Sequence, residues 1–185
     1  NIIKDLRSKP DKGKWQHIIF AVLMAFAIGF SLWKCYYGFG GNDESFYLTI
    51  PHRVTLGDSL LSDEWHLTQL SGFLLLPFVW LYTMITQSTV GIIFAARVFY
   101  VICHAVIVCV IYSRLKKYGY FSVFGCVLYF LFTPFDIMAL SYNTMGLDLI
   151  ALTGVLMATA DYSKKLPLII SGLAFAGAVL CCPYL

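Results

Sequence analysis

Five long, mostly apolar blocks set the strongest constraint on how this chain can fold. The first block, residues 15–39, is long enough to cross about 30 Å of hydrocarbon as a helix. Four more blocks lie at residues 90–113, 120–132, 145–160 and 166–182, and the third and fourth of the five must borrow flanking residues. Because backbone groups in a bilayer must be paired within their own segment, each block is expected to be helical. The sequence predicts an all-α, polytopic transmembrane helix bundle.

Composition supports this class and excludes others. The chain is 59% hydrophobic and only 12% charged, which is outside the balance of soluble domains. The net charge of +3 is small, so no nucleic-acid partner is predicted and membrane lipid is the expected environment. We therefore expect a multi-pass protein of the cell membrane.

A sixth apolar run, residues 71–86, decides the topology. Pro77 lies at its centre, and the run is short for a span. If it does not span, the basic clusters at 4–14, 114–117 and 164–165 all fall on one face, as the positive-inside rule requires of the cytoplasmic side. If it spans, the second and third clusters fall outside. We favour the first arrangement, with residues 71–86 as an interfacial or re-entrant helix.

The domain organisation follows from that choice. Residues 1–14 form a cytoplasmic tail, and residues 15–185 form one membrane domain. Residues 40–89 then make a single long outer loop, which contains the interfacial helix. The chain begins without methionine and ends close to an apolar segment, so we expect it to be a fragment of a longer protein.

Asp43 and Glu44 stand at the outer end of the first apolar block, where acidic side chains are costly. Acids in the first turn of a helix complement the helix dipole, which would explain one of them. A carboxylate at this position can also act as a base toward an acceptor hydroxyl, or bind a divalent cation such as Mg²⁺ or Mn²⁺. Both residues are therefore candidate catalytic residues.

Two arginines are candidate phosphate ligands. A guanidinium can hold phosphate oxygens through two parallel hydrogen bonds, so Arg53 and Arg97 can bind an anionic substrate. Arg97 lies about two turns into an apolar block, where an unpaired arginine is costly, so we expect it to have a partner. The structural alternative is an ion pair with an acid such as Asp136 or Asp148, or snorkelling to the surface.

Asp-Glu-Trp-His at residues 63–66 concentrates polar groups within the outer loop. A helix cap followed by an interfacial anchor explains the pattern, while Trp65 and His66 are also candidate substrate-binding residues. His66 lacks a second ligand at metal-site spacing. His104 lies inside a predicted span, and we expect it to be hydrogen-bonded within the bundle.

Several functional classes lack their motifs. The sequence has no Gly-x-x-x-x-Gly-Lys loop and no Gly-x-Gly-x-x-Gly turn for a nucleotide. It also has no Gly-x-Ser-x-Gly nucleophile elbow. Energy for a reaction is therefore expected to come from an activated, lipid-borne substrate.

Two stretches carry a resemblance to a known family. Residues 42–53 (Asn-Asp-Glu-Ser-Phe-Tyr-Leu-Thr-Ile-Pro-His-Arg) resemble the opening of the first outer loop in the GT-C superfamily of membrane glycosyltransferases. Thr133-Pro134, followed by Leu-Ser-Tyr-Asn-Thr at 140–144, resembles the second outer connection of that superfamily. The likeness is greatest to bacterial relatives of the protein O-mannosyltransferases and to the aminoarabinose transferases, and it covers their N-terminal part.

The resemblance implies a reaction and roles for residues. Family members transfer a sugar from a polyprenyl-phosphate carrier to an acceptor hydroxyl on the outer face. It implies that Asp43 is the leading base, or a ligand of a divalent metal, with Glu44 in support. The remaining candidate substrate-binding residues lie on the two predicted outer connections: Tyr47, Arg53, Trp65, His66, Asp136, Tyr142 and Asn143. Many relatives have an aspartate where this chain has Tyr142-Asn143, and Asp136 is the nearest substitute.

A membrane transporter or lipid flippase is the alternative from another class. Outer acids would then bind cations or a cationic solute. That class predicts internal repeats and acids near the bilayer midplane. Here most acids lie in the outer loop, and only Asp148 falls clearly within a predicted span.

Overall fold

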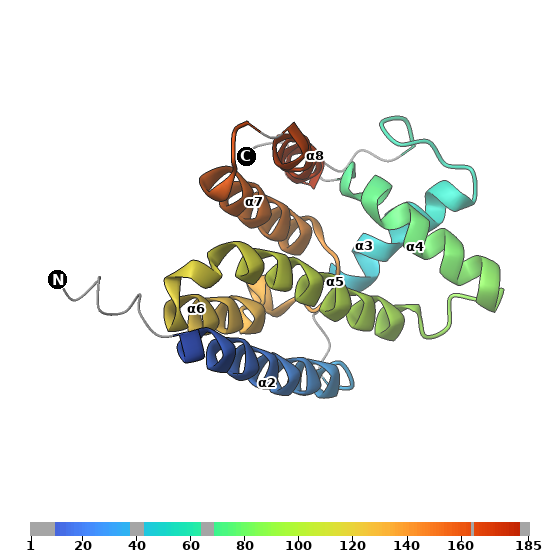
Figure 1. Cartoon of the computed structure of the whole chain (residues 1–185). Helices are drawn as coiled ribbons and strands as arrows, with labels where there is room; N and C mark the ends of the chain where they lie inside the picture. Colours follow the sequence, from blue (N-terminus) through green and yellow to red (C-terminus); the bar gives the residue numbers. More distant parts are fainter. Residues whose placement is uncertain (1–9, 38–42, 64–68, 164, 182–185) are drawn as a thin grey trace.

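The structure is a computed structural model that describes residues 10–37, 43–63, 69–163 and 165–181 (Figure 1). These residues form seven α-helices and two 3-10 helices, with no strand among them. The α-helices are α2 (Pro10–Lys34), α3 (Asp43–Thr55), α4 (Ser71–Thr86), α5 (Ile92–Leu115), α6 (Tyr120–Leu131), α7 (Tyr142–Thr159) and α8 (Lys165–Cys181). The 3-10 helices are η1 (Lys116–Tyr118) and η2 (Pro134–Asp136). The predicted all-α class is confirmed.

Two helical segments are long and apolar enough to cross a membrane. They are Gly13–Lys34, with 22 residues, and Ile92–Tyr118, with 27 residues. Three further apolar segments are shorter: Ser71–Thr86, Tyr120–Asp136 and Lys165–Cys181. Length and composition alone therefore identify two candidate spans.

Local chemistry explains where α7 begins. Its predicted start was residue 145, but the helix starts at Tyr142 because Ser141 caps it. The Ser141 hydroxyl accepts from the Thr144 amide at 3.2 Å, and the Thr144 hydroxyl accepts from the Ser141 amide at 2.8 Å. This reciprocal capping box pairs two amides that would otherwise lack partners. Pro77, in contrast, lies inside α4 without ending it.

Helix α5 is the central element of the fold (Figure 1). Helices α2 and α6 pack on one side of it and α7 on the other, while α8 packs against α7. Helices α3 and α4 pack against each other near the start of α5. The chain's interior therefore lies along both sides of α5.

Contacts at its two ends make α2 antiparallel to α5. Near the start of α2, the Gln16 amide donates to the Lys116 carbonyl oxygen at 2.9 Å. At its other end, the Cys35 carbonyl oxygen accepts from Arg97, near the start of α5, at 2.9 Å. The Lys34 ammonium there donates to the Asp136 carboxylate at 2.5 Å. The basic turn around Lys116 thus lies at the same end of the bundle as the start of α2.

The outward face of α2 is apolar along much of its length. Exposed residues follow one another at helical spacing: Ile18, Val22, Phe26, Phe30 and Trp33. Phe26 is 74% exposed, whereas Phe20 and Met24 on the other face are buried. An unbroken apolar stripe of this kind suits contact with hydrocarbon better than contact with water.

Close packing between α3 and α4 gives a testable expectation. A Cβ atom added at Gly72 would lie 2.9 Å from the Ile50 Cγ2 atom, with Pro51 also in contact. We expect Gly72→Ala to lower the free energy of unfolding by about 1–3 kcal/mol, because the packed helices must separate. The matched control is Gly125→Ala in α6, where an added Cβ meets no atom within 4 Å. Reversible unfolding in mixed detergent micelles measures both, and equal losses would contradict this packing.

Candidate functional site

A buried ion pair joins the start of α3 to the central helix α5. The Nε and Nη2 atoms of Arg97 donate to the Glu44 Oε2 atom at 2.9 and 2.6 Å. Glu44 is 1% exposed and Arg97 is 7% exposed. Because charges buried this deeply are costly unless paired, the contact fixes the start of α3 against α5.

The same guanidinium also reaches the end of α2. Its Nη1 atom donates to the Cys35 carbonyl oxygen at 2.9 Å, one residue beyond the last residue of α2. Helix ends leave carbonyl groups without intrahelical partners, so this bond satisfies one of them. Arg97 therefore connects α2, α3 and α5 at a single point.

The acid that pairs with Arg97 differs from the two that the sequence suggested. Asp136 instead bonds to Lys34, and Asp148 bonds to His104. Both predicted partners lie in or between apolar blocks, whereas Glu44 comes from the loop. The expected partner for Arg97 is thus confirmed, but it is Glu44 and neither of the two acids named as examples, because α3 folds back onto the start of α5.

Helices α3 and α7 meet through aromatic side chains. Tyr47 of α3 packs edge-on against Tyr142 of α7, with ring centroids 5.5 Å apart and an interplanar angle of 77°. Tyr47 is buried, and Tyr142 and its neighbour Asn143 are half-buried. Three of the predicted substrate-binding residues thus come from adjoining parts of the fold. Asp136 is separate from them in its interactions, since its exposed side chain binds Lys34.

Arg53 lies in the last turn of α3, in a more open setting than Arg97. Its Nε atom donates to the Asp58 carboxylate at 2.6 Å, and its side chain is 42% exposed. An exposed guanidinium keeps access to an anionic substrate, while Arg97 is committed to buried contacts.

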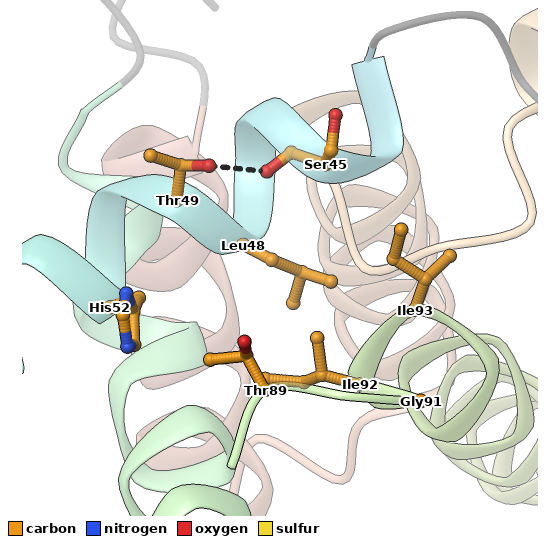
Figure 2. Close-up of a pocket in the computed structure, with 8 residues that line it drawn as sticks. All are labelled: Ser45, Leu48, Thr49, His52, Thr89, Gly91, Ile92 and Ile93. Carbon is orange, nitrogen blue, oxygen red and sulfur yellow. Dashed lines mark hydrogen bonds between the residues drawn. The ribbon is translucent and has the colours of Figure 1, made fainter.

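A pocket of about 340 Å³ opens between α3 and the start of α5 (Figure 2). Four residues on one face of α3 and four around the start of α5 line it: Ser45, Leu48, Thr49, His52, Thr89, Gly91, Ile92 and Ile93. None of these eight residues was predicted from sequence as a site residue. The spacing of Ser45, Thr49 and His52, which places three polar side chains on one helical face, could have indicated the pocket.

The side chains of three predicted site residues lie outside the described part of the chain. Asp43 is the first residue of α3, but its side chain lies outside the described residues. Trp65 and His66 lie outside them entirely. In the part of the chain that the structure describes, no group of three or more His, Cys, Asp or Glu side chains is placed to hold a metal ion. The roles predicted for these residues stay predictions.

A second buried polar cluster lies deeper in the bundle. The His104 Nδ1 atom lies 2.8 Å from the Asp148 Oδ1 atom, which also accepts from the Tyr129 hydroxyl at 2.8 Å. The other ring nitrogen of His104 lies 3.4 Å from the Tyr129 carbonyl oxygen. The cluster joins α5, α6 and α7, and it confirms that His104 is hydrogen-bonded within the bundle.

Comparisons with models of known protein families, with curated proteins and with solved structures find no match to this chain. Function must therefore be inferred from the residues of the site and their geometry. Near the start of α5, the site offers a buried arginine–glutamate pair, an accessible arginine, adjoining tyrosines and a partly polar pocket.

The buried Glu44–Arg97 pair is expected to contribute strongly to the stability of the fold. We expect Arg97→Met to lower the free energy of unfolding by about 3–5 kcal/mol, since Glu44 would remain buried without its partner. The double variant Arg97→Met/Glu44→Met should recover part of that loss. Lys34→Met is the control, because the Lys34–Asp136 pair is exposed on both sides and should contribute about 0–1 kcal/mol. Similar losses for Arg97→Met and Lys34→Met in micelle unfolding would contradict the assignment.

Proposed function

We propose that this chain is part of a membrane glycosyltransferase that transfers a sugar from a polyprenyl-phosphate carrier to an acceptor hydroxyl at the outer face. The observation that carries the proposal is the Glu44–Arg97 pair. The pair joins an acid of the predicted first outer loop to an arginine inside a candidate span. Both residues were predicted from sequence to belong to the same site. The resemblance to GT-C enzymes over residues 42–53 agrees with this assignment.

In the proposed reaction Asp43 acts as the base. Its carboxylate takes the proton of the acceptor hydroxyl while the hydroxyl oxygen forms a bond to the anomeric carbon. The bond from that carbon to the carrier phosphate breaks, and the phosphate leaves with the electron pair. Arg53 neutralises the charge that develops on the phosphate, because its guanidinium is accessible.

Glu44 and Arg97 hold the start of α3, where Asp43 is located. Catalysis by a positioned base requires the acceptor and the carboxylate to be oriented together. A buried ion pair next to the base in sequence supplies a rigid anchor for it. Tyr47 and Tyr142 would line the acceptor or sugar side, with Asn143 beside them.

The proposed setting is a polytopic membrane bundle with a cytoplasmic N-terminus. Gln16 places the start of α2 beside the basic turn at Lys116, as expected if both face the cytoplasm. The apolar stripe of α2 would face lipid. Helix α4 would lie at the outer interface, and α6, α7 and α8 would complete the bundle.

Replacing the proposed base tests the function. In the full-length protein we expect Asp43→Asn to abolish transfer from a polyprenyl-phosphate sugar to acceptor, because the amide cannot take up a proton. Loss is measured as radiolabelled sugar transferred by proteoliposomes. Asp161→Asn is the matched control, since this acid lies in the connection after α7 and should retain activity. Transfer by Asp43→Asn at the unchanged rate would remove Asp43 from the mechanism.

Transport is the second candidate, and the His104–Asp148–Tyr129 cluster favours it. Ionisable side chains buried within a membrane bundle commonly mark ion or proton pathways. Within the described residues the Asp148 carboxylate is 4% exposed and is held by both His104 and Tyr129. These bonds are also sufficient to explain the cluster as a structural junction between three helices.

Proton movement separates the two candidates. We expect proteoliposomes that contain the full-length protein to dissipate an imposed pH gradient no faster than empty liposomes, as reported by an entrapped pH-sensitive dye. Faster dissipation that Asp148→Asn abolishes and Asp161→Asn retains would favour transport over transfer. Correct folding of each variant is checked by its elution as a single species in detergent.

A further inference from the structure

Four basic side chains gather at the end of the bundle where α2 begins and α5 ends, and we call this surface the basic end (Figure 1). They are Lys14 near the start of α2, Arg114 in the last turn of α5, and Lys116 and Lys117 in η1. The buried Gln16 amide donates to the Lys116 carbonyl oxygen at 2.9 Å and so holds α2 against η1. Charges about 100 residues apart in sequence thus share one surface.

Two further contacts fix α2 at the basic end. The His17 Nδ1 atom lies 2.8 Å from the Tyr112 hydroxyl oxygen, and the Tyr112 ring stacks on Phe20 with centroids 3.6 Å apart. The Gln16 Nε2 atom also lies 3.5 Å from the Ser122 hydroxyl oxygen, in the first turn of α6. Helix α2 is therefore tied to α5, η1 and α6 close to its start, which keeps the four charges together.

The positive charges of the basic end are not neutralised by the described part of the protein. Within the described residues, none of the four cationic groups makes an ion pair, whereas Lys34, Arg53 and Arg97 each bind a carboxylate. The Lys117 ammonium lies over the ring of its neighbour Tyr118, which leaves its charge in place. The sequence ahead of Lys14 adds four basic and two acidic residues. The surface therefore needs an anionic partner from outside the chain.

Exposed apolar side chains border these charges. Trp15, next to Lys14, is 60% exposed and is followed at helical spacing by the exposed Ile18. On α6, Phe121 is 86% exposed, and Phe124 and Leu128 continue its face at the same spacing. Aromatic rings of this kind are typical of the headgroup level of a membrane, and the apolar faces beyond them suit hydrocarbon. One molecule with a phosphate and an acyl chain would meet both surfaces.

We propose that the basic end binds the headgroup phosphate of anionic phospholipids, whose acyl chains lie along the exposed apolar faces of α2 and α6. Clustered Lys and Arg side chains beside a membrane span attract anionic lipids, whereas a zwitterionic headgroup carries a cation that cancels the attraction. The partner is a lipid of the surrounding leaflet and not a substrate. The proposal requires the membrane setting but does not require sugar transfer.

Lipid selectivity is tested with three probes on the full-length protein in a nonionic detergent. Dioleoyl phosphatidylglycerol is anionic, dioleoyl phosphatidylcholine has the same chains without net charge, and glycerol 3-phosphate has the phosphate without chains. Native mass spectrometry resolves each bound molecule and gives its Kd. We expect phosphatidylglycerol to bind at least about 10-fold more tightly than either other probe, and more weakly as ionic strength rises. Equal binding of phosphatidylcholine would overturn the charge assignment, and equal binding of glycerol 3-phosphate would overturn the role of the apolar faces.

Variants locate the site. We expect Lys116→Gln/Lys117→Gln to weaken phosphatidylglycerol binding by about 25-fold, or about 5-fold for each lysine, and to leave phosphatidylcholine binding unchanged. Both side chains are exposed and lack hydrogen bonds to described residues, so folding should be retained. The matched control is Lys34→Gln/Lys165→Gln, which removes two positive charges outside the basic end and should weaken binding less than about 3-fold. Equal effects of the two double variants, or no effect of either, would overturn the proposal.

A single variant tests the contribution of α2. We expect Lys14→Gln to weaken phosphatidylglycerol binding by about 5-fold, because Gln16 holds Lys14 beside η1. Unchanged binding would overturn the inclusion of α2 in the site.

Lipid binding and sugar transfer can fail independently. Asp43→Asn should lose transfer and keep the selectivity for phosphatidylglycerol if both proposals are correct. Selectivity that depends on Lys116 and Lys117, in a protein that shows no transfer, would leave the basic end standing and overturn the transferase. Active transfer together with unselective lipid binding would overturn the basic end alone.

Discussion

The buried pair of Arg97 and Glu44 is the interaction on which the arrangement of α2, α3 and the start of α5 depends. Separating these side chains would leave a charge in an apolar interior, which is costlier than losing an ordinary hydrogen bond. The pair therefore fixes how α3 rotates about its own axis. That rotation turns Tyr47 toward Tyr142 and turns the face with Thr49 and His52 toward the pocket. The Tyr47–Tyr142 contact and the pocket lined by Thr49 and His52 therefore lie on different faces of α3, whose position is also set by its close packing against α4 at Gly72.

Helix α5 is central because it carries both buried polar junctions. Arg97 and His104 lie about two helical turns apart on it, so they point to similar sides of the helix. The first binds the ends of α2 and α3, while the second binds α6 and α7 through Tyr129 and Asp148. Among the described residues, every buried side-chain nitrogen and oxygen has a hydrogen-bond partner. An apolar surface alone would let neighbouring helices slide past one another, whereas these polar bonds define their register.

The sequence was sufficient to predict the helices, because apolar blocks of this length leave few alternatives. Residues 71–86 were predicted as a helix and form α4 with those bounds. The sequence was insufficient for contacts between distant elements. The cost of burying a charge depends on local position, so the sequence indicated that Arg97 needs a partner. It did not indicate Glu44, because that choice depends on how α3 folds back onto α5. The pocket was missed for the same reason, because half of its wall is the start of another helix. Only the polar spacing on α3 could have pointed to it.

The contacts of α2 also bear on the order in which this protein can assemble. Gln16 and Lys34, near opposite ends of the helix, find their partners 100 and 102 residues further along the chain. During synthesis α2 is therefore complete long before either Lys116 or Asp136 exists. Contacts so distant in sequence are slow to form, and the surfaces that await them stay open to wrong partners. Helix α2 is thus secured only after η1, α6 and η2 have been made, and until then its surface depends on its surroundings for shielding.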